Sequence, residues 1–180
     1  MTTVLEKTKW AIDPTHSEVG FKVKHLMITN VSGSFSKFNA EVNAEDDSFS
    51  NADIVFTADI DSISTNNEQR DTHLKSVDFF DAENHPQLTI KADGLSGEGE
   101  SRKLNGTITM RGVTKPIVMH VDFGGVAKDP WGNTKAGFTL TGTINRKDFG
   151  LNWNAPTEAG GLLVSEEVRL HAEIQLVKQA

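Results

Sequence analysis

The chain has 180 residues, of which 37% are hydrophobic and 24% are charged, the composition of one globular domain with a substantial core. Its 25 acidic residues outnumber the 18 basic ones and no long block of like charge occurs, so we expect neither a nucleic-acid-binding surface nor an anionic-membrane patch. Cysteine is absent, which excludes disulfides, cysteine-ligated zinc and thiol catalysis.

The first residues, MTTVLEKTKWAID, lack the basic region, the apolar run and the small-residue cleavage site of a signal peptide. No apolar run in the chain is long enough to span a bilayer. We therefore expect a cytoplasmic protein with no integral membrane segment. A leader removed from the chain would change this expectation to a periplasmic location.

Apolar and polar residues alternate along eight stretches of the chain. Successive side chains of a strand point to opposite faces, so each stretch predicts a strand with one apolar face. Turn clusters such as SGEGESRK and KDPWGN separate the stretches, which is typical of an antiparallel sandwich or barrel. We predict an all-β fold in a single domain, 1–180, with strands at 19–23, 38–42, 53–60, 88–92, 104–110, 117–123, 138–144 and 168–176.

A short helix is predicted between the third and fourth of these strands. Thr65 is followed three residues later by Glu68, which indicates a capping box, and Leu74 and Val77 would lie on one face of an amphipathic helix. The proline at position 86 prevents further helix. Before the last strand, the segment NAPTEAGGLLVSEE contains a proline and a Gly-Gly pair, so we predict a long, bendable loop there.

Small residues recur on the predicted apolar face. They are too short to meet across a barrel, so part of the interior would stay unfilled and could hold an apolar ligand. The alternative is that small residues fill the taper of an ordinary packed core, and the sequence leaves both readings open. The small residues are Ala40, Ala58, Ala92, Gly106, Gly142 and Ala172.

The segment RDTHLKSVDFFDAENHP, residues 70–86, concentrates charged, histidine and aromatic residues. Ser76, His73 and Asp78 are the residue types of a nucleophilic triad, but no recognisable motif surrounds them. His73 and His85 are twelve positions apart, which fits neither a helical histidine pair nor a zinc-binding spacing. We therefore predict no catalytic site and no metal site here.

The same segment is better explained as a lid over one mouth of the barrel. The apolar cover would come from Leu74, Val77, Phe79 and Phe80. Arg70 and Asp71 would pair with each other or with neighbours to fix the position of the lid. The alternative is a helix that plugs one end without touching a ligand. With His73, these residues are our candidates for a lid or head-group site.

Two further histidines are candidates for contact with a ligand head group. His25 continues the inward series of Val19, Phe21 and Val23, so its imidazole would lie at one end of an apolar interior, where it could hydrogen-bond a head group. His16 is a candidate of the same kind. The alternatives are a core histidine satisfied by backbone for His25 and a turn residue for His16.

Six stretches of sequence, in this order, resemble the YceI-like family, polyisoprenoid-binding proteins with a lipocalin-like barrel. The stretches are WAIDPTHSEVGFKVKHL, VSGSFSKF, RDTHLKSVDFFDAENHP, NGTITMRGVTKPI, RKDFGL and VRLHAEIQL. The resemblance implies an eight-stranded antiparallel barrel over residues 9–178, with one short helix covering part of it. It also implies an elongated apolar pore that holds a polyisoprenoid or a similar long-chain lipid.

Together, the alternation and the resemblance predict a non-enzymatic protein that carries or sequesters a long-chain isoprenoid lipid, such as a polyprenyl chain or an isoprenoid quinone. The alternatives are an enzyme acting on a lipid head group at the barrel mouth and a β domain acting through protein contacts. We expect no cofactor, no metal and no nucleic-acid partner, and a homodimer remains open. The apolar face predicts a tunnel lined by Phe21, Val23, Phe56, Ala58, Ile90, Ile108, Met119, Phe138, Leu140, Gly142 and Leu170.

Overall fold

The structure is a computed structural model that describes residues 6–154 and 164–179, and the middle of the predicted loop before the last strand lies outside these residues. The described residues form eleven strands, one α-helix and three short 3-10 turns. The 3-10 turns are η1 (Pro14–His16), η2 (Ile60–Ser62) and η3 (Arg146–Phe149). The other elements are β1 (Thr8–Ile12), β2 (Glu18–His25), β3 (Thr29–Phe35), β4 (Phe38–Ala44), β5 (Ala52–Asp59), β6 (Ile63–Ser64), α1 (Glu68–Lys75), β7 (Gln87–Ser96), β8 (Ser101–Met110), β9 (Val113–Lys128), β10 (Thr134–Asn145) and β11 (Val164–Lys178).

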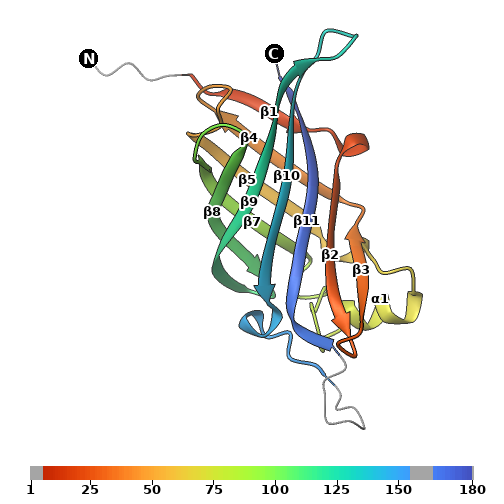
Figure 1. Cartoon of the computed structure of the whole chain (residues 1–180). Coiled ribbons are helices and arrows are strands. Elements are labelled where there is room, and N and C mark those ends of the chain that lie inside the picture. Colours follow the sequence, from red (N-terminus) through yellow and green to blue (C-terminus); the bar gives the residue numbers. More distant parts are fainter. Residues whose placement is uncertain (1–5, 155–163, 180) are drawn as a thin grey trace.

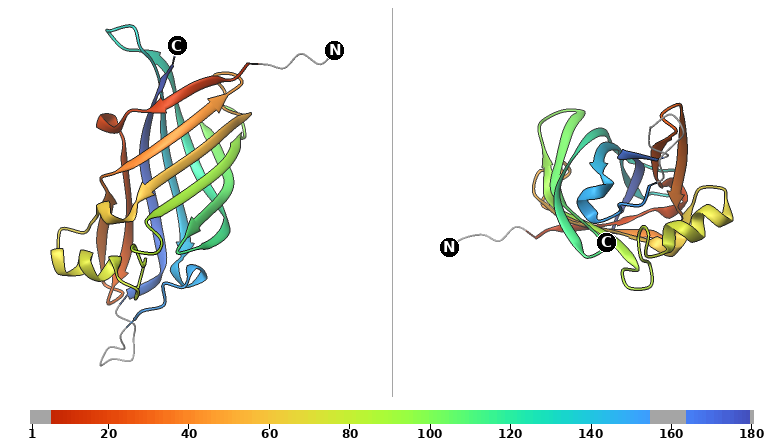
Figure 2. Two further views of the ribbon diagram at one scale, coloured as in Figure 1. Left: turned by 180° about the vertical axis from the view of Figure 1, so that it is seen from behind. Right: turned by 90° about the horizontal axis from the view of Figure 1, so that it is seen from below.

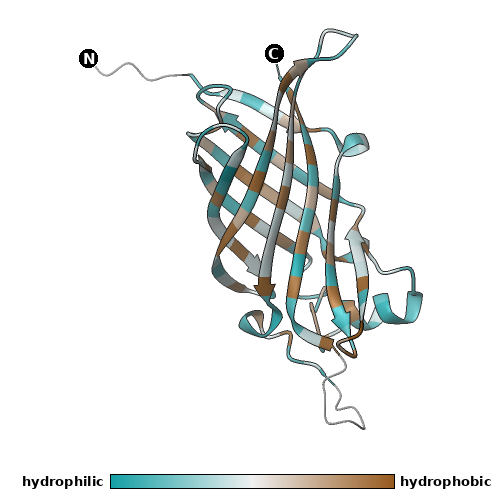
Figure 3. Ribbon diagram, viewed as in Figure 1, coloured by the Kyte–Doolittle hydropathy of each residue, from teal (hydrophilic) through white to brown (hydrophobic). Residues whose placement is uncertain are grey.

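The strands form one antiparallel sheet that closes on itself (Figures 1 and 2). The ring runs β1-β4-β5-β7-β8-β9-β10-β11, and β11 pairs back with β1. The predicted eight-stranded antiparallel barrel with a single short helix is therefore confirmed. Apolar and polar residues alternate along its strands, as Figure 3 shows.

Three of the barrel's strands are interrupted, which explains why the described chain has eleven strands in an eight-stranded barrel. β1 and β2 both pair with β11, with η1 between them, and their partners β4 and β3 are separated by only two residues. β5 continues through η2 into β6, which pairs with β3. The alternation had predicted β2, β4 and β5 but not their continuations β1, β3 and β6.

The barrel wall is incomplete at the end that holds α1, the lower end in Figure 1. There β6 pairs with β3, and the paired strands of the described chain include no β6–β7 contact. The 22 residues 65–86 separate the end of β6 at Ser64 from the start of β7 at Gln87, and α1 lies among them. The residues between β6 and β7 therefore cover the place where the sheet leaves the barrel open.

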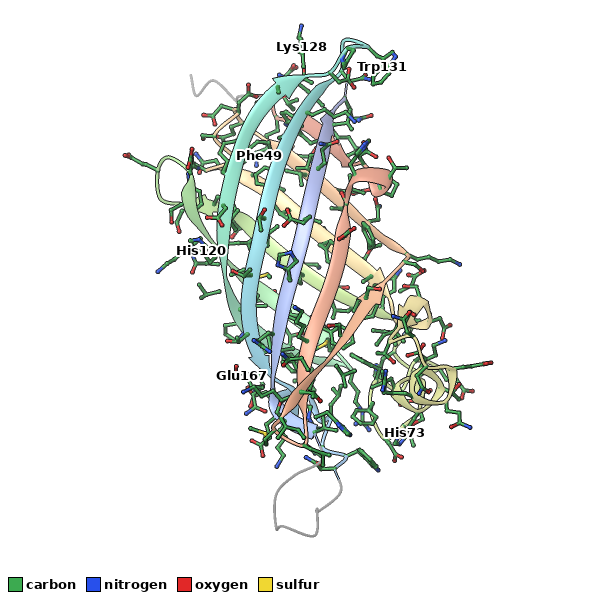
Figure 4. All side chains as sticks on the ribbon, turned by 45° about the vertical axis from the view of Figure 1, so that its right-hand side comes forward. Phe49, His73, His120, Lys128, Trp131 and Glu167 are labelled. Atoms are coloured by element: carbon green, nitrogen blue, oxygen red, sulfur yellow. The ribbon has the colours of Figure 1, made fainter. Side chains whose placement is uncertain are left out.

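The opposite, upper end is closed by an aromatic cluster. Phe49, in the turn between β4 and β5, is 1% exposed, and its ring centroid lies 5.1 Å from those of both Trp10 and Phe138. Phe123 stacks on Phe138 at 5.1 Å, and the buried Arg102 guanidinium lies 5.4 Å from the Phe123 ring centroid. Figure 4 shows Phe49 in the upper part of the barrel. Access to the interior must therefore come from the lower end.

Replacing Phe49 with Ala should destabilise the protein by about 3–5 kcal/mol, because it removes a buried ring and leaves a cavity among three aromatic residues. Urea unfolding followed by circular dichroism measures this loss. The matched control is Trp131→Ala, whose ring is 83% exposed in the β9–β10 turn and should change the free energy of unfolding by less than about 0.5 kcal/mol. Equal losses in the two variants would contradict the assigned closure.

Candidate functional site

Two adjoining cavities occupy the interior of the barrel. The upper cavity has a volume of about 140 Å³ and an almost wholly apolar lining. The lower cavity has a volume of about 480 Å³ and reaches the incomplete part of the wall. Phe21, Phe35, Leu88 and Leu170 line both cavities, so they form the partition between them. The barrel interior thus holds two adjoining chambers in place of one continuous tunnel.

Small inward residues account for the upper cavity. Ala40, Ala58 and Ala172 line it, and Ala40 and Ala58 are buried. Gly142 differs, because a Cβ atom built there would lie 3.2 Å from Cγ of Met119. The methionine fills the space that the missing side chain leaves, and Gly142 lines neither of the two cavities. Its predicted place in the tunnel lining is therefore wrong.

The other predicted tunnel residues border the cavities, as the strand alternation requires. Val23 lines the lower cavity. The upper cavity is lined by Phe21, Phe56, Ala58, Ile90, Ile108, Met119, Phe138, Leu140 and Leu170.

Helix α1 begins at a different residue from the predicted one. Its N-cap is Asn67, whose side-chain oxygen accepts a hydrogen bond of 3.0 Å from the Arg70 backbone N–H. Thr65 instead anchors the first turn, since its hydroxyl donates to Asp71 Oδ1 at 2.6 Å and accepts from Arg70 Nε at 2.7 Å. Arg70 and Asp71 are therefore fixed through Thr65, a neighbour, and not through a direct ion pair in the described structure.

The end of α1 and the residues after it face the lower cavity. Leu74 of α1 lines it together with Phe79 and Phe80, and the Phe80 ring centroid lies 6.5 Å from that of Phe35 in the partition. The helix ends at Lys75, and Val77 is 64% exposed. The predicted helical face shared by Leu74 and Val77 is therefore wrong, because the chain leaves the helix before it reaches Val77.

A buried arginine that we did not predict as a site residue holds neighbouring chain segments together beside the lower cavity. Arg146 is 3% exposed, lines this cavity, and donates to the backbone carbonyls of Leu151, Trp153, Val164 and Ser165. Burial lowers the pKa of its guanidinium from the ordinary value. The sequence did contain the signal, because position 146 continues the inward period of two that runs through 138, 140, 142 and 144.

The charged and histidine side chains that line the lower cavity are all basic. They are Lys24, His25, Arg70, His73 and Arg146, and the described lining includes no carboxylate. In a chain of net charge −7 this is an unusual local composition. The lower cavity thus combines an apolar interior with a polar rim of hydrogen-bond donors, which can bind an acceptor group at the end of an apolar chain.

His16 is not part of this rim. It lies before the start of β2, whereas His25 is the last residue of that strand, so the strand's length separates them. The imidazole Nδ1 of His16 lies 2.8 Å from Asp13 Oδ2, and Asp13 also accepts from Lys135 Nζ at 2.7 Å. His16 therefore belongs to a structural network at the upper end. The alternative interpretation, a turn residue, fits it better than contact with a head group.

The structure does not assemble the suggested triad. The Ser76 hydroxyl donates to the backbone carbonyl of His73 at 2.6 Å, so it does not face the imidazole. His73 Nε2 lies 2.9 Å from Asp78 Oδ2. Among residues 6–154 and 164–179, no group of three or more side chains is arranged to hold a metal ion.

The Asp13 network predicts a pH-dependent contribution to stability. Hydrogen bonds from Lys135 and Thr15 hold the pKa of the Asp13 carboxyl well below its ordinary range, so the ionised form stabilises the folded state above about pH 4. Asp13→Asn should lower the free energy of unfolding by about 2 kcal/mol at neutral pH. The difference from the parent should shrink as the pH falls below about 4, because Asp13 of the unfolded chain then binds a proton while the carboxyl of the folded protein stays ionised.

Urea unfolding at a series of pH values measures this effect. Asp148→Asn is the control, since Asp148 is exposed and the same substitution there should leave the pH profile unchanged. A constant difference between the parent and Asp13→Asn from neutral to acidic pH would contradict the role given to the ionised Asp13.

A closed antiparallel barrel with internal apolar chambers and one polar mouth defines the class of small β-barrel binding proteins. Residues 10–176 match the YceI-like domain family. A UPF0312 protein of Staphylococcus aureus strain N315 is 36% identical over 169 residues, which is 93% of this chain and 96% of that protein. The chain belongs to the YceI-like family.

Solved structures agree with this membership. The YceI protein of Campylobacter jejuni is 33% identical, with a TM-score of 0.74 over 100% of this chain and 99% of that one. BcnA of Burkholderia cenocepacia shares the fold at 22% identity, with a TM-score of 0.76 over 91% and 98% of the two chains. A polyisoprenoid-binding domain from Saccharophagus degradans does so at 13% identity, with a TM-score of 0.68 over 94% and 98%.

In the part of the chain that the structure describes, no helix has the length and apolar character needed to cross a bilayer.

Proposed function

We propose that this protein binds a long-chain isoprenoid lipid, such as a polyprenyl chain or an isoprenoid quinone, as a carrier or sequestering protein. The observation that carries the proposal is the pair of apolar chambers in line, closed above by the Phe49 cluster and bordered below by basic side chains. The lipid tail would occupy the chambers and its head group would lie at the lower mouth. The description of the Saccharophagus degradans neighbour as a polyisoprenoid-binding domain supports a ligand of this class.

Burial of the tail supplies the binding energy. Each buried CH₂ group contributes about 0.8 kcal/mol, so a chain that buries about ten of them gains roughly 8 kcal/mol before the costs of association and ordering. An isoprenoid chain long enough to fill both chambers must pass the partition, where Phe21 and Phe35 lie 5.9 Å apart between ring centroids. The partition rings would rotate aside when the tail enters.

The lower rim would interact with the head group. His25 lies at the end of β2 with its side chain in the cavity lining, and Arg70 borders the cavity from α1. Both can donate to the oxygen atoms of a quinone or a phosphorylated head group. An enzyme acting on the head group is the weaker alternative, because Ser76 is turned away from the His73 imidazole.

Native mass spectrometry of the protein purified from its own host tests the proposal directly, through the mass of any retained lipid. Ala58→Phe should reduce the retained lipid at least tenfold, because the new ring fills part of the upper cavity. The matched control is Val55→Phe in the same strand, where the added ring points out of the barrel from a side chain that is 37% exposed. Equal lipid retention in the parent and both folded variants would overturn the proposed binding site.

The segment from Arg70 to Phe80 is proposed to control entry as a lid. Replacing Leu74 and Phe80 with Ala should speed release of a fluorescent polyprenyl analogue about tenfold in stopped-flow experiments, because both side chains border the lower cavity. Val77→Ala is the control within the same segment, since this side chain is 64% exposed. Unchanged release from the double variant, together with a lower melting temperature, would make the segment a structural plug.

A further inference from the structure

The turn between β2 and β3 exposes three consecutive apolar side chains. Leu26, Met27 and Ile28, which we call the hairpin tip, are 40%, 57% and 78% exposed. The turn is closed by a hydrogen bond of 3.2 Å from the Ile28 backbone N–H to the carbonyl of His25. Single exposed apolar residues are common on soluble proteins, but three in a row at the end of a hairpin are not explained by packing.

The backbone of the hairpin tip makes this composition costly for the folded state. Leu26 and Met27 have φ angles of 53° and 60°, both in the left-handed region. Tight hairpin turns that need two such residues favour Asn and Gly, because a side chain with a Cβ is strained there. Leu26 and Met27 therefore lower the stability of the folded protein through strain as well as exposure. Binding to something outside the chain would account for their presence in the turn.

The hairpin tip lies beside the mouth of the lower cavity. Val23, Lys24 and His25, the last residues of β2, line that cavity. Figure 1 shows the β2–β3 turn at the lower end of the barrel, the end that α1 covers. Anything that binds the tip is thus brought to the mouth of the cavity.

The charge of this hairpin differs from that of the whole chain. The β2–β3 hairpin, Glu18–Phe35, carries Lys22, Lys24 and His25, and its one acidic residue, Glu18, lies at the end far from the tip, although the chain has a net charge of −7. On the neighbouring strand β11, Glu166 pairs with Lys147 at 2.8 Å, and Glu167 is exposed. The overall composition argued against an anionic-membrane patch, but the basic residues Lys24 and His25 directly precede the exposed apolar tip.

We propose that the hairpin tip inserts into the surface of an anionic phospholipid bilayer and places the mouth of the lower cavity against the membrane. Apolar residues at a loop tip that follows Lys22, Lys24 and His25 of the same strand suit the boundary between head groups and acyl chains. The purpose of this docking, exchange of a lipid between bilayer and barrel, rests on the proposed function. The docking itself requires no bound ligand.

The test compares vesicles of phosphatidylcholine with vesicles that contain equal parts of phosphatidylcholine and phosphatidylglycerol, using co-sedimentation of the full chain. The decisive variant is Leu26→Asn with Met27→Gly, which gives the turn its preferred residues. We expect its partition into the mixed vesicles to fall at least tenfold, while its melting temperature stays equal to or rises above that of the parent. A loss of vesicle binding caused by unfolding would instead lower the melting temperature.

Trp131→Ala is the matched control, because Trp131 is the most exposed of the described large apolar side chains and lies in the β9–β10 turn at the upper end (Figure 4). We expect this variant to bind vesicles like the parent. Unchanged binding of the tip variant, absence of binding by the parent, or loss of binding in Trp131→Ala alone would each overturn the proposal. Equal binding to both kinds of vesicle would overturn its anionic part.

Native mass spectrometry of the same preparations separates this inference from the proposed function. Retained lipid in a tip variant that no longer binds vesicles supports both the barrel site and the docking surface. Tip-dependent vesicle binding by a protein that never retains lipid supports the docking and overturns the proposed function.

Discussion

The enclosed interior depends on the pairing of β1 with β11. Only three residue pairs join these strands, Trp10 with Lys178, Ala11 with Val177 and Ile12 with Leu176. They complete the ring from the first described strand to the last, so the upper end has no free sheet edge and can be sealed from inside by Trp10 and Phe49. Without this closure, the inner face would be one side of an open sheet and would have to pack on another layer.

The interruptions in the strands make the two ends of the barrel different. Between β1 and β2, η1 lets the chain pair with the upper part of β11 through one strand and with its lower part through the next. Between β5 and β6, η2 moves the chain away from β7 and toward β3. A continuous strand through η2 would extend the wall beside β7, so this interruption leaves the lower end for α1 and the cavity mouth.

Much of the barrel was predictable because alternation is a local property of a strand. The eight predicted stretches lie in the eight strands of the ring or their continuations, and many of the inward residues of those stretches border the cavities. The alternation failed in β3, where Gly33 occupies an inward position and the Phe21 ring fills the space of its missing side chain. Because a side chain of another strand fills this inward position, the sequence of β3 by itself shows no apolar series that would predict a strand.

Tertiary contacts also account for the parts of the site that the sequence did not reveal. Gly142 has the right phase for the tunnel, but the side chain of Met119, on the neighbouring strand, fills the space beside it. Arg146 has the right phase too, yet its role depends on four carbonyl groups that come together only when the chain after β10 folds back. Periodicity predicts the direction of a side chain, while its neighbours decide what it meets.

Left-handed backbone at bulky residues has opposite consequences at the two ends. Phe49 adopts a φ of 58°, and its ring is 1% exposed in the upper aromatic cluster, so burial offsets the strain within the protein itself. Leu26 and Met27 adopt similar angles, but they are 40% and 57% exposed. Burial in a bilayer would offset the backbone strain of the hairpin tip, as burial in the barrel interior offsets the strain at Phe49.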